Sequence, residues 1–191
     1  MKRAVLIALM ISLTLFCGCS KSAKYEEKFT NWKADYLAAG EHQIEAVVTA
    51  SDDDKVCEYT LLYTKNAESE TVEVLSPELI ANIKAEIGEK EVSLSYDGAM
   101  LDTGSALSGN LSPLMALPTL MKVIKEGHVE NTWSETENKA ALTVTELEMP
   151  DGTIMTLWQR SSDMTPQHVD VRSGERVEIK IDIKKFDQIE V

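Results

Sequence analysis

Apolar and polar residues alternate along much of this chain, a pattern typical of strands with one buried face and one solvated face. The clearest example is residues 176–187, where four β-branched residues alternate with charged ones. Similar runs cover residues 43–48 and 56–64. Tight-turn dipeptides join neighbouring runs at Asp97-Gly98, Asp151-Gly152 and Ser173-Gly174. The pattern predicts an α+β fold, mostly β, with about ten strands in a single curved antiparallel sheet.

Residues 25–39 switch to the 3.6-residue period of a helix. Phe29, Trp32 and Tyr36 are spaced by three and four residues, so they share one helix face. Gly40 follows at the position of a C-terminal cap. We expect a helix here, and residues 19–24 before it form a short polar tether.

Residues 77–87 are predicted to form a second helix. Ser76 and Pro77 are favoured N-cap and first-turn residues. Apolar residues at positions 79, 80, 83 and 87 would form its buried stripe, and Gly88 would end it.

Residues 112–127 are predicted to form a third helix, which is apolar nearly all round. Pro118 lies inside it and should kink or break it there. Such a helix either fills the core as a plug or covers a cavity as a lid. The candidate cavity or lid residues are Leu114, Met115, Leu117, Pro118, Leu120, Met121 and Ile124.

Residues 1–18 have the pattern of a signal peptide. Lys2 and Arg3 precede an apolar run at residues 4–16, which as a helix would rise about 20 Å, short of the roughly 30 Å hydrocarbon core of a bilayer. The run ends in Leu15-Phe16-Cys17-Gly18-Cys19, which resembles the lipobox of bacterial lipoproteins. On that resemblance Cys19 becomes the mature N-terminus and carries the lipid, palmitate included, that anchors the protein. The alternative is an ordinary secretory signal that is cut nearby.

The charge balance argues against nucleic acid as a partner. Removing residues 1–18 leaves 173 residues with 17 basic and 32 acidic side chains. So acidic a surface repels phosphate backbones and anionic headgroups, so the lipid on Cys19 must attach the protein to the membrane. The length suits one domain, at residues 25–191.

Cys57 has no partner for an internal disulfide once Cys17 is removed and Cys19 is lipidated. It is in phase with Leu61 and Tyr63 in a strand pattern, so we expect it to point into the core as a small hydrophobe. A reactive or intermolecular thiol is the alternative.

The sequence has no motif that indicates catalysis. His42, His128 and His168 are scattered, without cysteine or carboxylate at metal-ligand spacing. A glycine-rich phosphate loop and a serine elbow are both missing. We therefore expect no metal, no cofactor and no enzymatic activity.

Several turn and helix-start residues resemble those of the LolA/LolB-like outer-membrane lipoprotein carriers, in particular the clostridial lipoproteins related to the spore germination lipoprotein. The residues that carry the resemblance are Val74-Leu75-Ser76-Pro77-Glu78, Ser95-Tyr96-Asp97-Gly98, Ser112-Pro113, Ala116-Leu117-Pro118 and Gly127. The resemblance implies an open β half-barrel with helices covering its concave face and an apolar cavity that takes acyl chains. Trp133 and Trp158 belong either to the core or to the cavity mouth.

Two functions follow from this picture. In the first, a lipoprotein anchored on the extracytoplasmic side of the cell membrane binds lipid or the acyl groups of lipoproteins. In the second, a protein of sporulation or germination type binds and activates a cell-envelope partner such as a cell-wall hydrolase. A half-barrel has free sheet edges, so a homodimer is also compatible with the sequence.

Overall fold

A computed structural model of the chain describes residues 20–52, 55–88, 92–101, 112–173 and 176–188. The signal segment and Cys19 lie outside these residues, as do Gly174 and residues 102–111. The described part contains two α-helices, two short 3-10 turns and eleven strands. Their bounds are α2 (Ser20–Ala39), β1 (His42–Asp52), β2 (Lys55–Lys65), β3 (Glu70–Ser76), η1 (Glu78–Ile80), β4 (Ile83–Ile87), β5 (Val92–Tyr96), β6 (Ala99–Leu101), η2 (Pro113–Met115), α3 (Ala116–Glu126), β7 (His128–Glu137), β8 (Ala140–Glu148), β9 (Ile154–Arg160), β10 (Pro166–Ser173) and β11 (Arg176–Gln188).

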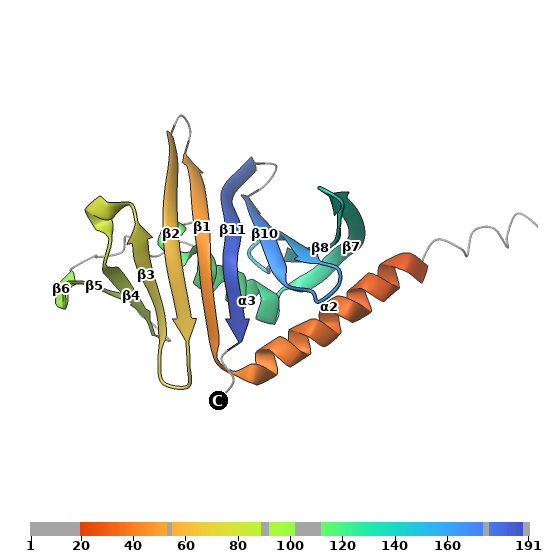
Figure 1. Cartoon of the computed structure of the whole chain (residues 1–191), viewed down its shortest axis with the longest axis horizontal. Helices are drawn as coiled ribbons and strands as arrows, with labels where there is room; N and C mark the ends of the chain where they lie inside the picture. Colours follow the sequence, from red (N-terminus) through yellow and green to blue (C-terminus); the bar gives the residue numbers. More distant parts are fainter. Residues whose placement is uncertain (1–19, 53–54, 89–91, 102–111, 174–175, 189–191) are drawn as a thin grey trace, which may run out of the picture.

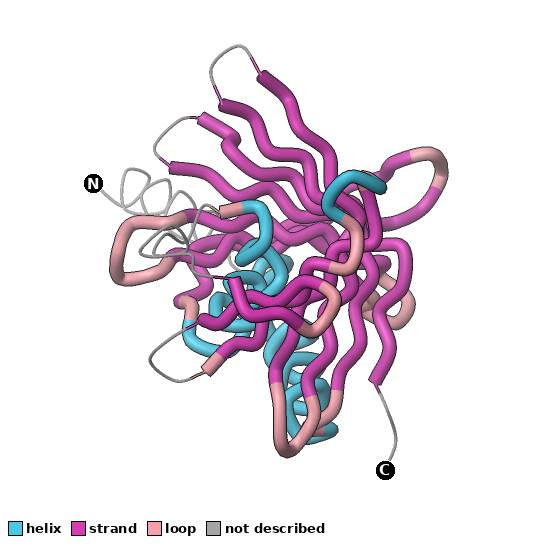
Figure 2. Tube along the Cα trace, turned by 90° about the vertical axis from the view of Figure 1, so that its left-hand side faces the viewer, coloured by secondary structure: helices cyan, strands magenta, loops and turns pink. Residues whose placement is uncertain are grey.

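The strands form one antiparallel sheet that does not close on itself (Figure 1). Its order is β6-β5-β4-β3-β2-β1-β11-β10-β9-β8-β7, so each half of the chain builds a meander and β11 returns to pair with β1. The helices lie on the concave side, with the strands curving around them (Figure 2). The predicted α+β fold with one curved antiparallel sheet and helices on its concave face is confirmed, with eleven strands instead of about ten.

The buried residues of the alternating strands pack against the helices and form the core. In β1, Ile44, Ala46 and Val48 are fully buried and join the same apolar cluster as Ile181 of β11. In α2 the predicted stripe is confirmed, since Phe29 and Tyr36 have no exposed surface. Full burial of such side chains stabilises the fold by about 1.5–3 kcal/mol each relative to exposure.

Two tight turns have the backbone geometry that their sequences require. Asp97 and Gly98 have φ angles of 50° and 80°, so the β5–β6 hairpin is confirmed. Gly40 has φ +76°, the left-handed conformation that ends α2.

The predicted helix at residues 77–87 is wrong. Only Glu78–Ile80 forms a short 3-10 turn, and Ile83–Ile87 is strand β4. Asn82 adopts φ 68°, which a helix cannot contain, and its N–H donates to the carbonyl of Val74 at 2.9 Å. Positions 83 and 87 share a face in a helix and in a strand alike, and pairing with β3 and β5 on both sides stabilises the strand.

The predicted burial of Cys57 is also wrong, because this thiol is exposed. The phase of the strand is correct, since Leu61 and Tyr63 on the same strand are fully buried. The β1–β2 hairpin extends past the described helices, however, so its outer part lies beyond them (Figure 1).

Candidate functional site

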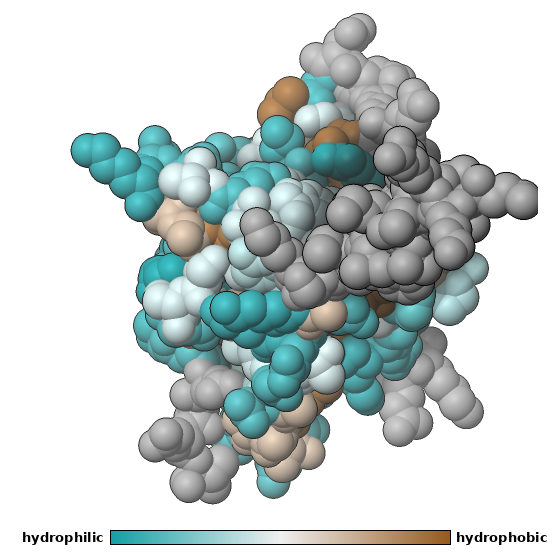
Figure 3. All heavy atoms as spheres, turned by 90° about the vertical axis from the view of Figure 1, so that its right-hand side faces the viewer, coloured by the Kyte–Doolittle hydropathy of each residue, from teal (hydrophilic) through white to brown (hydrophobic). Residues whose placement is uncertain are grey.

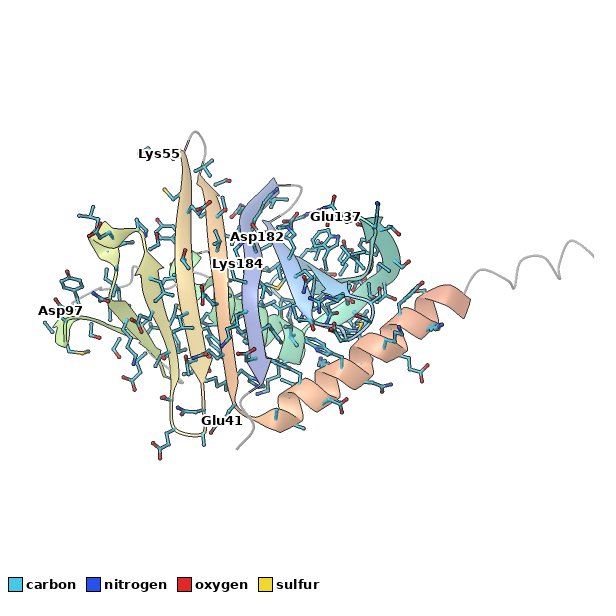
Figure 4. All side chains as sticks on the ribbon, viewed as in Figure 1. Glu41, Lys55, Asp97, Glu137, Asp182 and Lys184 are labelled. Atoms are coloured by element: carbon cyan, nitrogen blue, oxygen red, sulfur yellow. The ribbon has the colours of Figure 1, made fainter. Side chains whose placement is uncertain are left out.

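A cavity of about 700 Å³ opens between α3 and one end of the sheet. Glu41, labelled in Figure 4, marks this end, where α2 passes into β1. The wall comes from the end of α2, the adjacent ends of β1 to β4, and one face of α3. The lining residues are Leu37, Gly40, His42, Lys65, Glu70, Ile87, Met115, Pro118, Thr119, Met121, Lys122, Lys125 and Glu126.

Helix α3 has two faces with different environments. One face packs on the sheet and contains Leu117, Leu120 and Ile124, none of which has exposed surface. The other face lines the cavity at positions 118, 119, 121, 122, 125 and 126, which recur at helical spacing, and Met115 of η2 precedes them. The helix therefore serves both as part of the core and as one wall of the cavity.

The seven candidate residues divide between these faces. Met115, Pro118 and Met121 line the cavity. Leu117, Leu120 and Ile124 lie in the core, and Leu114 in η2 packs half-buried against it.

Pro118 does not kink the helix, contrary to the sequence prediction. Residues 113–115 form a 3-10 turn, and α3 begins only at Ala116, with Met115 as its N-cap residue. Pro118 is thus in the first helical turn, where a backbone N–H has no intrahelical partner to lose. The chain changes geometry at Met115, three residues earlier than predicted.

His42 is the most unusual polar residue of the cavity wall. Its ring stacks on Tyr36 with centroids 4.0 Å apart, and Tyr36 Oη donates a hydrogen bond to Met121 Sδ at 3.6 Å. The side chain is 3% exposed, and its Nδ1 has no hydrogen-bond partner within the described part of the chain. Burial, followed by the charge of Lys65, lowers the pKa of His42, so the ring is neutral at pH 7.

His42 had been considered only as a metal ligand, and its place in the cavity wall was not predicted from the sequence. A signal was available, because the alternation of Ile44, Ala46 and Val48 continues back to position 42 in the same phase. A histidine at that position belongs on the buried face of β1.

The mouth of the cavity carries charged side chains. Lys65 Nζ and Glu70 Oε2 form an ion pair at 3.0 Å across the β2–β3 hairpin. Lys122 and Lys125 lie one helical turn apart on the cavity face of α3, and both are exposed. The cavity thus combines an apolar wall with a polar mouth.

Trp133 and Trp158 do not line the cavity. Both flank Val144 in neighbouring strands, on the face of the sheet opposite to core residues such as Leu157. Their indole N–H groups donate to the two oxygens of the Glu135 carboxylate, at 2.6 Å from Trp133 and 3.1 Å from Trp158. The two rings cover Val144, which has no exposed surface, on the outer face.

The described residues contain neither a group that could hold a metal ion nor a helix that could span a membrane. Among the described residues, no group of three or more His, Cys, Asp or Glu side chains is placed to hold a metal ion. None of the described helices is long and apolar enough to span a membrane. The surface at the β7 end is largely hydrophilic (Figure 3).

Comparison with known proteins gives similarity in fold without similarity in sequence. No protein-family model matches the chain, and no curated protein matches it. Among solved structures, a putative outer-membrane lipoprotein-sorting protein domain from Vibrio parahaemolyticus superposes with a TM-score of 0.51 at 11% identity, covering 87% of this chain and 92% of that one.

Two further structures superpose less well. A LolA superfamily protein from Nitrosomonas europaea gives a TM-score of 0.45 at 11% identity, covering 86% of this chain and 94% of that one. A chain in the complex of the CwlD amidase with the GerS lipoprotein from Clostridioides difficile gives 0.34 at 15% identity, covering 86% of this chain and 92% of that one. On the Vibrio superposition, the chain shares the fold of that putative outer-membrane lipoprotein-sorting protein domain.

Proposed function

We propose that this protein is an extracytoplasmic, membrane-anchored lipoprotein whose half-barrel binds lipid or the acyl groups of lipoproteins without catalysing a reaction. The cavity is the observation that carries the proposal. Its volume of about 700 Å³ lies within the roughly 300–1,000 Å³ of small-molecule sites. Its inner wall includes Leu37, Ile87, Met115 and Met121, flexible or branched apolar side chains suited to an alkyl chain.

The position of α2 supports an anchor at Cys19. The described part of the helix begins at Ser20, the residue after that cysteine. Ser22 already contacts β7, since its carbonyl accepts a hydrogen bond from Thr132 Oγ1 at 3.0 Å. An acylated Cys19 would therefore hold the domain within a few residues of the bilayer, with the N-terminus of α2 toward the lipid.

Native mass spectrometry of residues 20–191, purified from cells without detergent, tests lipid binding. We expect a mass increment that organic extraction removes and identifies as lipid. Met115→Asp should abolish it by placing a charge in the cavity wall, whereas Leu79→Asp, at a side chain that is 91% exposed, should not. A wild-type protein that is always free of lipid would refute the proposal.

Partner binding is a second candidate function, favoured by exposed apolar side chains on the β5–β6 hairpin and the neighbouring η1 turn. Leu79, Tyr96 and Met100 are 91%, 43% and 71% exposed, and β6 is a free sheet edge in the described part of the chain. The partner is a cell-envelope protein such as a cell-wall hydrolase. Cross-linking in cells through a photoreactive residue at position 100 should capture that protein, and capture of only a second copy of this chain would contradict this candidate.

A further inference from the structure

The charges around the cavity have the opposite balance to those of the whole chain. The lining contains three lysines and two glutamates, whereas the full sequence has 19 basic and 32 acidic residues. An acidic protein with excess positive charge at a cavity mouth attracts anions to that mouth and repels them elsewhere. The mouth is therefore electrostatically distinct from the rest of the surface.

Two of the lysines are available to a ligand. Lys65 is already paired with Glu70 at 3.0 Å. Lys122 and Lys125 are exposed, lie on the cavity face of α3, and form no ion pair with any described residue. Glu126, which also lines the cavity, leaves one net positive charge on this face of the helix.

His42 is a buried polar side chain of the cavity wall. A buried ring nitrogen without a partner is destabilising. Nδ1 of His42 is such an atom, and the ring lies on the cavity wall. The same wall holds the Lys65–Glu70 pair, so His42 lies next to the polar mouth rather than among the apolar side chains alone.

We propose that the cavity selects amphiphiles with an anionic head group, a carboxylate or a phosphate, attached to an alkyl chain. Lys122 and Lys125 bind the head at the mouth, beside the His42 ring. The chain lies against Ile87, Met115 and Met121. The inference deepens the proposed function and rests on it, because it assumes that the cavity takes an alkyl chain.

The test compares four probes that share one chain length and differ in the head. Dodecanoate and dodecyl phosphate are anionic, dodecan-1-ol is neutral, and dodecyltrimethylammonium is cationic. Each is titrated calorimetrically, below its micelle concentration, into residues 19–191 with Cys19→Ser, which includes every described helix and strand. Inorganic phosphate is a fifth probe, which separates a lipid head from a free anion.

We expect both anionic probes to bind at least about tenfold more tightly than the neutral and cationic ones. The double variant Lys122→Gln, Lys125→Gln should lose that preference, while the matched double variant Lys55→Gln, Lys84→Gln keeps it. Lys55 lies at the opposite end of β2 (Figure 4), and Lys84 is exposed on β4. The melting temperature of each variant verifies that it is folded.

The outcomes separate the two proposals. If all four amphiphiles bind equally, or if the α3 double variant keeps the anionic preference, the head-group inference is wrong and lipid binding stands. If inorganic phosphate binds as tightly as dodecyl phosphate, the site is for a free anion and the inference is wrong. If no amphiphile binds to the wild-type protein, the proposed function fails together with the inference.

Discussion

The two faces of α3 predict that substitutions a few residues apart have different effects on stability. Leu117 is fully buried on the core face, and Leu117→Ala removes three carbon atoms from it. At about 0.8 kcal/mol for each buried methylene, the lost transfer free energy is about 2.4 kcal/mol, and the cavity left behind raises the cost to roughly 3 kcal/mol. Met115 is half-buried beside an existing cavity, so Met115→Ala creates no enclosed void and should cost about 1 kcal/mol or less.

Urea unfolding of the two variants and the wild type, followed by far-UV circular dichroism, measures this difference. The slope of the free energy of unfolding against urea should stay the same, and only the midpoint should move. Equal losses for Leu117→Ala and Met115→Ala would refute the assignment of the two faces. A larger loss for Met115→Ala would mean that this residue, and not Leu117, is packed in the core.

Three further predictions concern single residues. Burial lowers the pKa of His42 below its usual 6.5, so the unfolded chain binds the proton more readily than the folded protein. The stability that depends on a neutral His42 is therefore complete above pH 6.5 and declines as the pH falls below it. The melting temperature of His42→Phe should lack this decline. Gly127→Ala places a Cβ 2.6 Å from the carbonyl oxygen of Val123, so α3 and β7 must shift; urea unfolding should show a loss of roughly 1–3 kcal/mol, and no loss would contradict this contact. Cys57 is exposed and should react with a thiol reagent in the native protein as fast as in urea, which a buried thiol cannot do.

The sequence by itself determined most of the strands and the first helix. Alternation in β1 and β11 requires one buried face, and the Asp97-Gly98 turn requires a hairpin, because these are local constraints on neighbouring residues. The stripe of α2 is equally local, with Phe29 and Tyr36 buried as the period predicts. These patterns were sufficient for the fold class.

The tertiary structure decided the features that depend on distant partners. Residues 83–87 satisfy a helical and a strand pattern equally, and the neighbouring strands β3 and β5 select the strand. Cys57 has the phase of a core residue but is exposed. The division of α3 into a core face and a cavity face, and the inclusion of His42 in the cavity wall, follow from where the helix packs on the sheet. Periodicity specifies which residues share a face, whereas what that face contacts is set by packing between segments far apart in the sequence.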